Sequence, residues 1–383
     1  MLPFVRMFEY GNINPVDELV DLRSGIRHFM ALRNNGDVYS TGINANSQCG
    51  MNDKSYVTRN RWNKCLINNV KRIICGGYSS IAITNDNKVM MCGRKSPTGS
   101  PLALNEIYEV WTDVTDKFTQ FLSVIDSITI KMSTFNIFVL NGTDLYSMGL
   151  STNSGRSTGS GLTSDTTTFV QVASNVSKLY CTDYSAITFY IDTSRDVYGC
   201  GINSVGSMGN NSVNDIYAFT KLSCPIKVNH ISCDVQSGCL FFGDSLVYKT
   251  GSALNGGLGD GAISGNYTSF TLHVSIPSSL DITKIQSTSL MSSPGLTLLI
   301  VDGSLWESGY DNYGAGGTGS STSNKVYFEK LAVQPNISSM KLVASQYTTY
   351  VWNGKELWCT GDPESLPSVT NFYTFTKISF PWI

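Results

Sequence analysis

The chain has 383 residues, of which 15% are charged, and a formal net charge of −2 at pH 7. A nucleic-acid interface needs clustered positive charge, and the chain contains no run of Lys or Arg, so we expect no nucleic-acid partner. The first ten residues lack the apolar core of a signal peptide and no apolar run approaches a membrane span, so we expect neither secretion by a signal peptide nor membrane insertion.

The first predicted unit covers residues 24–42, where a small residue is followed by an apolar run, a turn and a short strand ending at Gly42. The turn is Asn34-Asn-Gly-Asp, and these residue types tolerate the positive φ that a tight hairpin requires. Residues 1–11 precede the unit and are surplus to it. We expect them to form either an N-terminal arm or a strand.

The ending of this unit recurs along the chain as Val or Leu, then Tyr, Trp or Met, two further residues and Gly. The anchor glycines of these endings are Gly42, Gly93, Gly149, Gly201, Gly251, Gly309 and Gly361. Their successive intervals are 51, 56, 52, 50, 58 and 52 residues. A period of about fifty residues without helical segments predicts a β-propeller with one blade per repeat. We therefore expect an all-β single domain over residues 1–383, a seven-bladed β-propeller with about four strands per blade.

A column of small residues lies upstream of each predicted hairpin. Its members are Ser24, Cys75, Ser133, Cys181, Cys233, Ser287 and Ala344. We place this column at the central channel, where the innermost strands of a propeller converge and short side chains fit. Cysteines that exchange with Ser and Ala at one repeat position are interpreted as reduced, structural thiols of an interior compartment, with disulfides or metal binding as the alternative.

The two ends of the chain predict how the ring closes. The C-terminal Tyr373-Thr-Phe-Thr-Lys-Ile matches the internal Tyr217-Ala-Phe-Thr-Lys-Leu, so it is predicted to be a blade strand. Its continuation is Leu19-Val-Asp-Leu at the other end of the chain. We predict that the C-terminal strand pairs with the N-terminal blade, which would close the ring and remove two sheet edges.

The loops after two anchors carry a family resemblance. Gly42-Ile-Asn-Ala-Asn-Ser-Gln-Cys-Gly and Gly201-Ile-Asn-Ser-Val-Gly-Ser-Met-Gly resemble the Gly-x-Asn-x-x-Gly-Gln-Leu-Gly loop of the regulator of chromosome condensation repeat. Ile74-Cys-Gly-Gly-Tyr-Ser resembles that repeat's Cys-Gly-x-x-His-Ser segment, and the family's His is kept at His28. The resemblance implies a seven-bladed propeller. In the family this fold serves nucleotide exchange on a small GTPase, inhibition of secreted β-lactamases and plain binding roles, so the fold alone does not select a function.

The sequence contains few residues in an arrangement that would support catalysis. Its three histidines, His28, His230 and His273, show no metal-ligand spacing, and we interpret His28 as a structural strand residue rather than a functional one. Gly314-Ala-Gly-Gly-Thr-Gly matches a dinucleotide-binding pattern by letter, but a strand is expected after it where a helix is required. Trp306 and its repeat equivalents are interpreted as blade core rather than as a stacking site. We therefore expect no catalytic residue, no metal and no cofactor.

The sequence favours a non-catalytic protein-binding propeller, a component of a large assembly such as a phage virion or an adhesion structure. The alternative is a docking regulator of a small GTPase or a protein inhibitor of an enzyme. In either case the loops of a rigid ring would contact other proteins. The candidate partner-binding loop contains Tyr310, Asp311 and Tyr313, an aromatic and acidic combination that suits a binding hot spot. The expected location is the cytoplasm or a virion.

Overall fold

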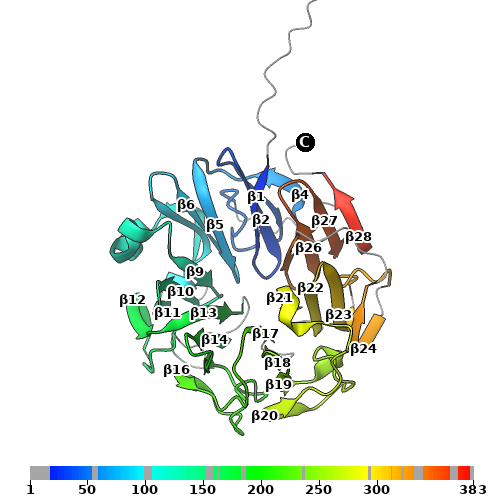
Figure 1. The fold of residues 1–383 in the computed structure, drawn as a ribbon. Helices are drawn as coiled ribbons and strands as arrows, with labels where there is room; N and C mark the ends of the chain where they lie inside the picture. The colour runs from blue at the N-terminus through cyan, green and yellow to red at the C-terminus, as the bar shows by residue number, and fades with distance from the viewer. Residues whose placement is uncertain are drawn as a thin grey trace, which may run out of the picture.

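The computed structural model describes residues 18–53, 59–98, 106–151, 158–162, 164–182, 187–234, 238–291, 295–311, 313–320, 323–331, 340–362 and 370–379. These residues form seven four-stranded sheets arranged in a ring (Figure 1). The predicted all-β, seven-bladed β-propeller is therefore confirmed. The predicted arm or strand over residues 1–11 lies outside the described residues. Within the described ranges, no helix has the length and apolar character needed to cross a membrane.

Each blade takes four consecutive strands, in chain order from the innermost to the outermost. Blades 1 to 4 are β1 (Leu19–Ser24), β2 (His28–Arg33), β3 (Val38–Gly42), β4 (Arg59–Lys64); β5 (Val70–Gly76), β6 (Ser79–Thr84), β7 (Val89–Arg94), β8 (Ile107–Asp113); β9 (Thr129–Met132), β10 (Asn136–Asn141), β11 (Asp144–Gly149), β12 (Thr166–Ala173); and β13 (Val176–Cys181), β14 (Ile187–Asp192), β15 (Val197–Gly201), β16 (Ile216–Lys221). Blades 5 to 7 are β17 (His230–Asp234), β18 (Gly238–Phe242), β19 (Val247–Ser252), β20 (Asn266–Leu272); β21 (Ile285–Met291), β22 (Leu296–Val301), β23 (Ser304–Asp311), β24 (Ser323–Lys330); and β25 (Lys341–Ala344), β26 (Thr348–Trp352), β27 (Leu357–Gly361), β28 (Phe372–Ile378).

The second strand of every blade is buried on both faces. All six residues of β6 and all six of β22 are buried, because each blade is covered by the next blade on either side. A strand covered on both faces needs no apolar–polar alternation, which explains the continuous apolar runs such as Phe29-Met-Ala-Leu in β2. The core clusters consequently lie between neighbouring blades rather than within a single sheet.

The ring does not close by strand pairing between the termini, so that part of the prediction is wrong. The C-terminal strand β28 pairs with β27 of its own blade, and β1 pairs with β2 of the first blade. The match between β28 and the segment at Tyr217 was sound, since both are outermost strands (β28 and β16) of their own blades. Among the described strands the first is innermost and the last is outermost, so each of the seven blades has four strands of its own and no strand is shared.

Side chains close the ring instead. One apolar cluster joins Leu19, Leu22 and Phe29 of blade 1 to Tyr350 and Trp352 of blade 7. The rings of Phe29 and Tyr350 meet edge to face with centroids 4.5 Å apart. Figure 1 shows blades 1 and 7 side by side at this junction. Closure therefore depends on burial of apolar surface and on a main-chain hydrogen bond from Gln346 N to Ile26 O, and not on strand pairing.

The small-residue column lies at the channel in most blades, as predicted. Ser24, Cys75, Cys181 and Ala344 line a cavity of about 440 Å³ between the innermost strands. The register corrects the column in blade 3, where Met132 rather than Ser133 lies opposite the start of the second strand. In blade 6 the register also corrects the column. Ser287 pairs with Ile300, whereas the residue at the column position is Leu290, three residues later, which pairs with Thr297.

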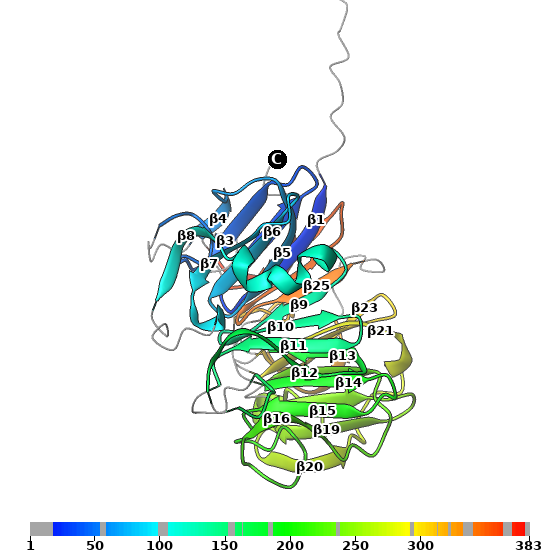
Figure 2. The same ribbon diagram turned by 90° about the vertical axis from the view of Figure 1, so that its left-hand side faces the viewer.

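Cysteines and one helical insertion complete the fold. All ten cysteines belong to the described part of the chain, and none of them forms a disulfide. Short 3-10 turns occur at η1 (Ser96–Thr98), η3 (Leu254–Gly256) and η4 (Ile282–Lys284), and η2 (Thr115–Val124) is longer. Phe118 and Phe121 of η2 pack on Phe169 of β12, with ring centroids 5.1 and 5.2 Å apart. Figure 2 shows the helical segment at the side of the ring, beside blades 2 and 3. The repeat pattern did not predict this helical segment, which accounts for the longer interval before Gly149.

Candidate functional site

Two loops of each blade emerge on the same face of the ring, which we call the loop face. The AB loop connects the first strand of a blade to the second, and the CD loop connects the third to the fourth. The two loops are tied together by a main-chain hydrogen bond from the residue after the anchor glycine. Ile43 N donates to Arg27 O at 2.8 Å in blade 1, and Asp362 N donates to Tyr347 O at 3.0 Å in blade 7.

The anchor glycines make this approach of the two loops possible. Gly42 has φ +105°, and a Cβ there would lie 2.4 Å from Arg27 O. Gly361 has φ +118°, and its Cβ would lie 2.2 Å from Tyr347 O. Only glycine meets both demands, a positive φ and a carbonyl at van der Waals contact with Cα. The repeat signature therefore serves to hold the AB loops in place.

The AB loops of neighbouring blades are also bonded to one another. Gln346 N donates to Ile26 O at 2.9 Å, and Ile26 N donates to Gly77 O at 3.0 Å. These bonds link blades 7, 1 and 2 around the channel mouth. The main chain of these AB loops is therefore fixed, and so are the positions from which the neighbouring side chains project. A partner that binds these side chains costs less conformational entropy than it would on a mobile loop.

A chain of aromatic and arginine side chains lies on this base. The rings of Tyr313 and Tyr347 have centroids 4.2 Å apart, and the Arg27 guanidinium lies 5.4 Å from the centre of the Tyr347 ring. In the next blade the Arg94 guanidinium lies 4.3 Å from the centre of the Tyr78 ring. All five side chains are half-buried and retain an exposed part. We call this set the aromatic–arginine arc.

The two arginines of the arc each have a polar neighbour, an amide beside Arg94 and a carboxyl group near Arg27. Arg94 Nε donates to Asn46 Oδ1 at 3.1 Å. Burial raises the pKa of Asp362, and the nearby Arg27 partly opposes that rise. Cation–π pairs of this kind contribute about 0.5–1 kcal/mol at exposed sites and more when a partner excludes water. The arc is therefore stable without a partner and gains from being covered by one.

The structure separates the three residues of the predicted partner-binding loop. Tyr313 belongs to the arc, and Tyr310 is half-buried at the end of β23. Asp311 is only 1% exposed, and its carboxylate accepts hydrogen bonds from Gly316 N at 3.0 Å and from Thr318 Oγ1 at 3.1 Å. Asn44 and Asn203 occupy the equivalent positions in blades 1 and 4, where Cys49 N and Met208 N donate to them. Asp311 thus holds the shape of the CD loop that presents Tyr313.

The CD loops of blades 3 to 5 present aliphatic side chains instead of aromatic ones. Leu162, Val213, Leu254 and Ile263 lie on these loops and are between 43% and 57% exposed. The loop face therefore combines an aromatic and cationic sector over blades 6 to 2 with an aliphatic sector over blades 3 to 5. Clustered exposed apolar groups are typical of a surface that another protein covers, although other exposed apolar side chains, such as Val274 and Leu66, lie on loops of the opposite face.

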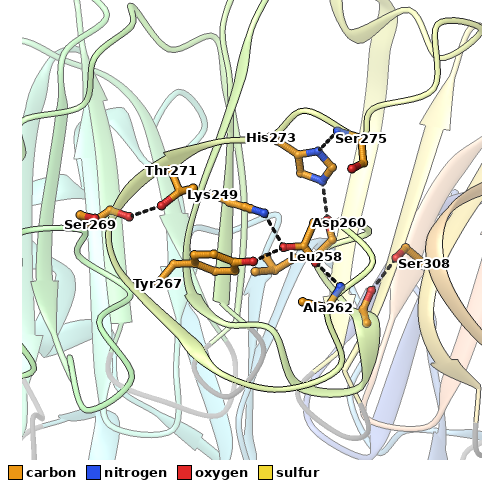
Figure 3. Close-up of polar contacts among 11 residues, drawn as sticks. Lys249, Leu258, Asp260, Ala262, Tyr267, Ser269, Thr271, His273, Ser275 and Ser308 are labelled. Atoms are coloured by element: carbon orange, nitrogen blue, oxygen red, sulfur yellow. Dashed lines mark hydrogen bonds and ion pairs between the residues drawn. The ribbon is translucent and has the colours of Figure 1, made fainter.

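The titratable groups elsewhere in the ring are used for structure. His28 Nε2 lies 2.9 Å from Ser80 Oγ inside the core, and burial lowers the pKa of His28 to about 3. Lys249 forms a buried ion pair with Asp260, which also accepts from Tyr267 Oη at 2.6 Å (Figure 3). His273 Nε2 lies 2.7 Å from Leu258 O beside them. Among the described residues, no group of three or more His, Cys, Asp or Glu could hold a metal ion.

The dinucleotide-like string Gly314–Gly319 lies in the CD loop of blade 6. The next described element is the strand β24, so no helix N-terminus faces a phosphate there. Trp306 is 6% exposed and belongs to a core cluster, in agreement with its interpretation as blade core.

The sequence reasoning missed Arg27, Tyr78, Tyr347 and Arg94. A signal for three of them was present, because Arg27, Tyr78 and Tyr347 each stand directly before the second strand of their blade. An alignment of the repeats on that strand shows large side chains at this position in blades 1, 2, 3 and 7 and small residues in blades 4, 5 and 6.

The sequence matches no model of a protein family and no curated protein. Among solved structures, human WBSCR16 superposes with a TM-score of 0.70 at 13% identity, covering 90% of this chain and 95% of that chain. Yeast RCC1 (Prp20), solved in complex with Kap60, has a TM-score of 0.70 at 13% identity and covers 95% and 86%. Prp20p from Saccharomyces cerevisiae, studied with its binding to Gsp1p and histones, has a TM-score of 0.64 at 14% identity and covers 85% and 80%. These likenesses agree with the seven-bladed propeller fold of this chain.

Proposed function

We propose that this chain is a non-catalytic protein-binding propeller that docks its partner on the loop face, with the aromatic–arginine arc as the centre of the interface. The observation that carries the proposal is the contact series Tyr313, Tyr347 and Arg27. Tyr347 and Arg27 lie on AB loops that are bonded from blade to blade, and Tyr313 lies on the CD loop of blade 6. Tyr and Arg are the residue types most enriched in binding hot spots.

Rigidity supports a docking role rather than a catalytic one. The arc residues are presented by loops whose main chain is fixed by hydrogen bonds, so little conformational entropy is lost on binding. The buried His28 and the Lys249–Asp260 pair are engaged within the core and do not converge on an open cleft.

We further propose that the partner belongs to a large assembly, such as a phage virion or an adhesion structure, in the cytoplasm or in the virion itself. A polar surface with few charges, 15% of the chain, suits permanent contacts better than electrostatic encounter. The competing proposal is regulation of a small GTPase or inhibition of an enzyme by docking. It is favoured by the shared fold with Prp20p, whose binding to Gsp1p has been studied.

Charge reversal in the arc tests the docking proposal. Arg27→Glu should weaken binding of proteins captured from the source organism by roughly tenfold or more, as truncation of a hot spot does. Lys88→Glu is the matched control, because Lys88 is an exposed cation in the turn between the second and third strands, on the opposite face. Tyr347→Ala and Tyr327→Ala form a second pair, since Tyr327 is a 50% exposed tyrosine on the outermost strand β24.

Two results decide the question. Equal binding by wild type, Arg27→Glu and Tyr347→Ala would refute docking through the arc. A partner lost only in the arc variants supports docking, and its identity selects between the finer proposals. Stoichiometric copurification with structural proteins favours the assembly role, whereas faster nucleotide release from a small GTPase, abolished by Arg27→Glu, favours regulation.

A further inference from the structure

The central cavity has a charge distribution that the fold does not require. The cavity of about 440 Å³ lies between the innermost strands β1, β5, β9, β13 and β25. Three consecutive blades each contribute one cation to its lining, Arg23 from β1, Arg72 from β5 and Lys131 from β9. None of the described lining residues carries a carboxylate.

The nearby carboxylates do not neutralise these three cations. Asp21 forms an ion pair with Arg23 at 2.9 Å, and Asp126 forms one with Lys71 at 2.5 Å. Lys131 makes no ion pair with any described residue. Of the three lining cations, only Arg23 is directly paired with a carboxylate among the described residues, which leaves positive charge inside the cavity.

Burial and the second arginine also work against the charge of Arg72. Burial lowers the pKa of Arg72, Arg23 lowers it further, and only Asp21 and Asp126 oppose these effects. Among the described residues, the Arg72 guanidinium donates one hydrogen bond, from Nη1 to Ile125 O, which is long at 3.4 Å. Like charges facing a cavity with low-dielectric walls focus a positive potential into it, and an anion entering the cavity would relieve their repulsion.

We propose that the central channel of this propeller binds a small multivalent oxyanion through Arg23, Arg72 and Lys131. The planar guanidinium groups match the geometry of phosphate or carboxylate oxygens, and the Lys131 ammonium adds a point charge. Uncharged polar groups of Ser24 and Thr129 also line the cavity. Its volume falls in the range of ordinary small-molecule sites. This site is separate from the aromatic–arginine arc and does not depend on the docking proposal.

The test is calorimetric titration of the full chain with sodium pyrophosphate, with inorganic phosphate and citrate in parallel and NaCl at matched ionic strength as the reference. Wild type should bind pyrophosphate, and Lys131→Gln and Arg72→Gln should each weaken binding roughly tenfold, the value of one charge-assisted hydrogen bond. Lys221→Gln is the matched control, because it removes one cation from the outermost strand β16.

Each outcome bears on the proposal. Tighter binding of pyrophosphate than citrate identifies a phosphorylated ligand, and the reverse identifies a polycarboxylate. No binding of any of the three probes beyond the NaCl reference would overturn the proposal, and so would equal affinity in wild type and Lys131→Gln. Lys131 is exposed, so its variant should fold even if Arg72→Gln does not. Arg27→Glu should leave anion binding unchanged, which separates this test from that of the docking proposal.

Discussion

Glu307 provides a sharp test of the core because it is a buried acid without a partner. It lies on β23, is 1% exposed, and neither of its carboxyl oxygens accepts a hydrogen bond from a described residue. Burial first, and then the nearby Asp311, raise the pKa of Glu307 from 4.5 to about 8, while Lys325 partly opposes the rise. In the preceding blade the equivalent position holds Lys249, which is paired with Asp260. Glu307 is therefore protonated in the folded protein at neutral pH.

The sign of the effect follows from the raised pKa. The pKa of Glu307 is higher in the folded state than in the unfolded state, so its proton stabilises the folded state. This stabilisation is fully present below pH 4.5 and is lost as the pH rises towards about 8. At about 1.4 kcal/mol per pKa unit, the free energy of unfolding falls by about 4 kcal/mol between pH 5 and pH 8 through this one carboxyl. Glu307→Gln removes that loss, because an amide does not ionise.

Urea denaturation at several pH values between 5 and 8 measures the effect. The variant should be more stable than wild type by about 4 kcal/mol at pH 8, and the two should lie within about 1 kcal/mol of each other at pH 5. The three histidines titrate in both proteins, so their contribution cancels in the difference. Glu356→Gln is the control, because its salt bridge with Lys377 lowers its pKa and its titration lies below this pH range. Parallel stability curves for wild type and Glu307→Gln would refute the reasoning.

Three further substitutions test the closure, the anchors and the buried ion pair. Leu22→Ala should lower the free energy of unfolding, measured by urea denaturation, by about 2–5 kcal/mol because it opens a cavity at the ring junction. Val20→Ala on the same strand should cost little, because Val20 is 50% exposed. Equal effects would contradict closure by packing. Gly361→Ala should lower the melting temperature more than Gly265→Ala. Both glycines have a positive φ, but only at Gly361 would the new Cβ lie against a carbonyl oxygen. Similar losses in the two variants would argue against the anchor role. Asp260→Asn should cost about 3–5 kcal/mol by leaving the buried Lys249 charge unpaired, and a second change to Met at that lysine should restore most of the loss if the cost is electrostatic.

Much of the fold could be predicted because each blade is specified locally. The anchor glycines mark a backbone position where φ is positive and a carbonyl is too close for Cβ, as at Gly42. Asn and Gly turns define the hairpins, and the second strands show the continuous apolar runs of a strand covered on both faces. These signals recur seven times, so the number of blades followed from the sequence.

The candidate site was only partly accessible from the sequence. The loop of blade 6 was selected for its composition, and Tyr313 does lie in the aromatic–arginine arc. The same composition also drew attention to Asp311, whose burial depends on how the loop folds over Gly316 and Thr318. The partners of Tyr313 come from other blades, more than thirty residues away along the chain.

The sequence by itself thus determined the module, its number and its strands, since these depend on residues close together in the chain. Tertiary structure alone decided how the ring closes, which side chains meet on the loop face and which cations line the channel. Each of these features arises between blades, where the contacts are set by the angle and register at which separate sheets pack. This angle and this register depend on residues of the whole ring and cannot be predicted from any single repeat.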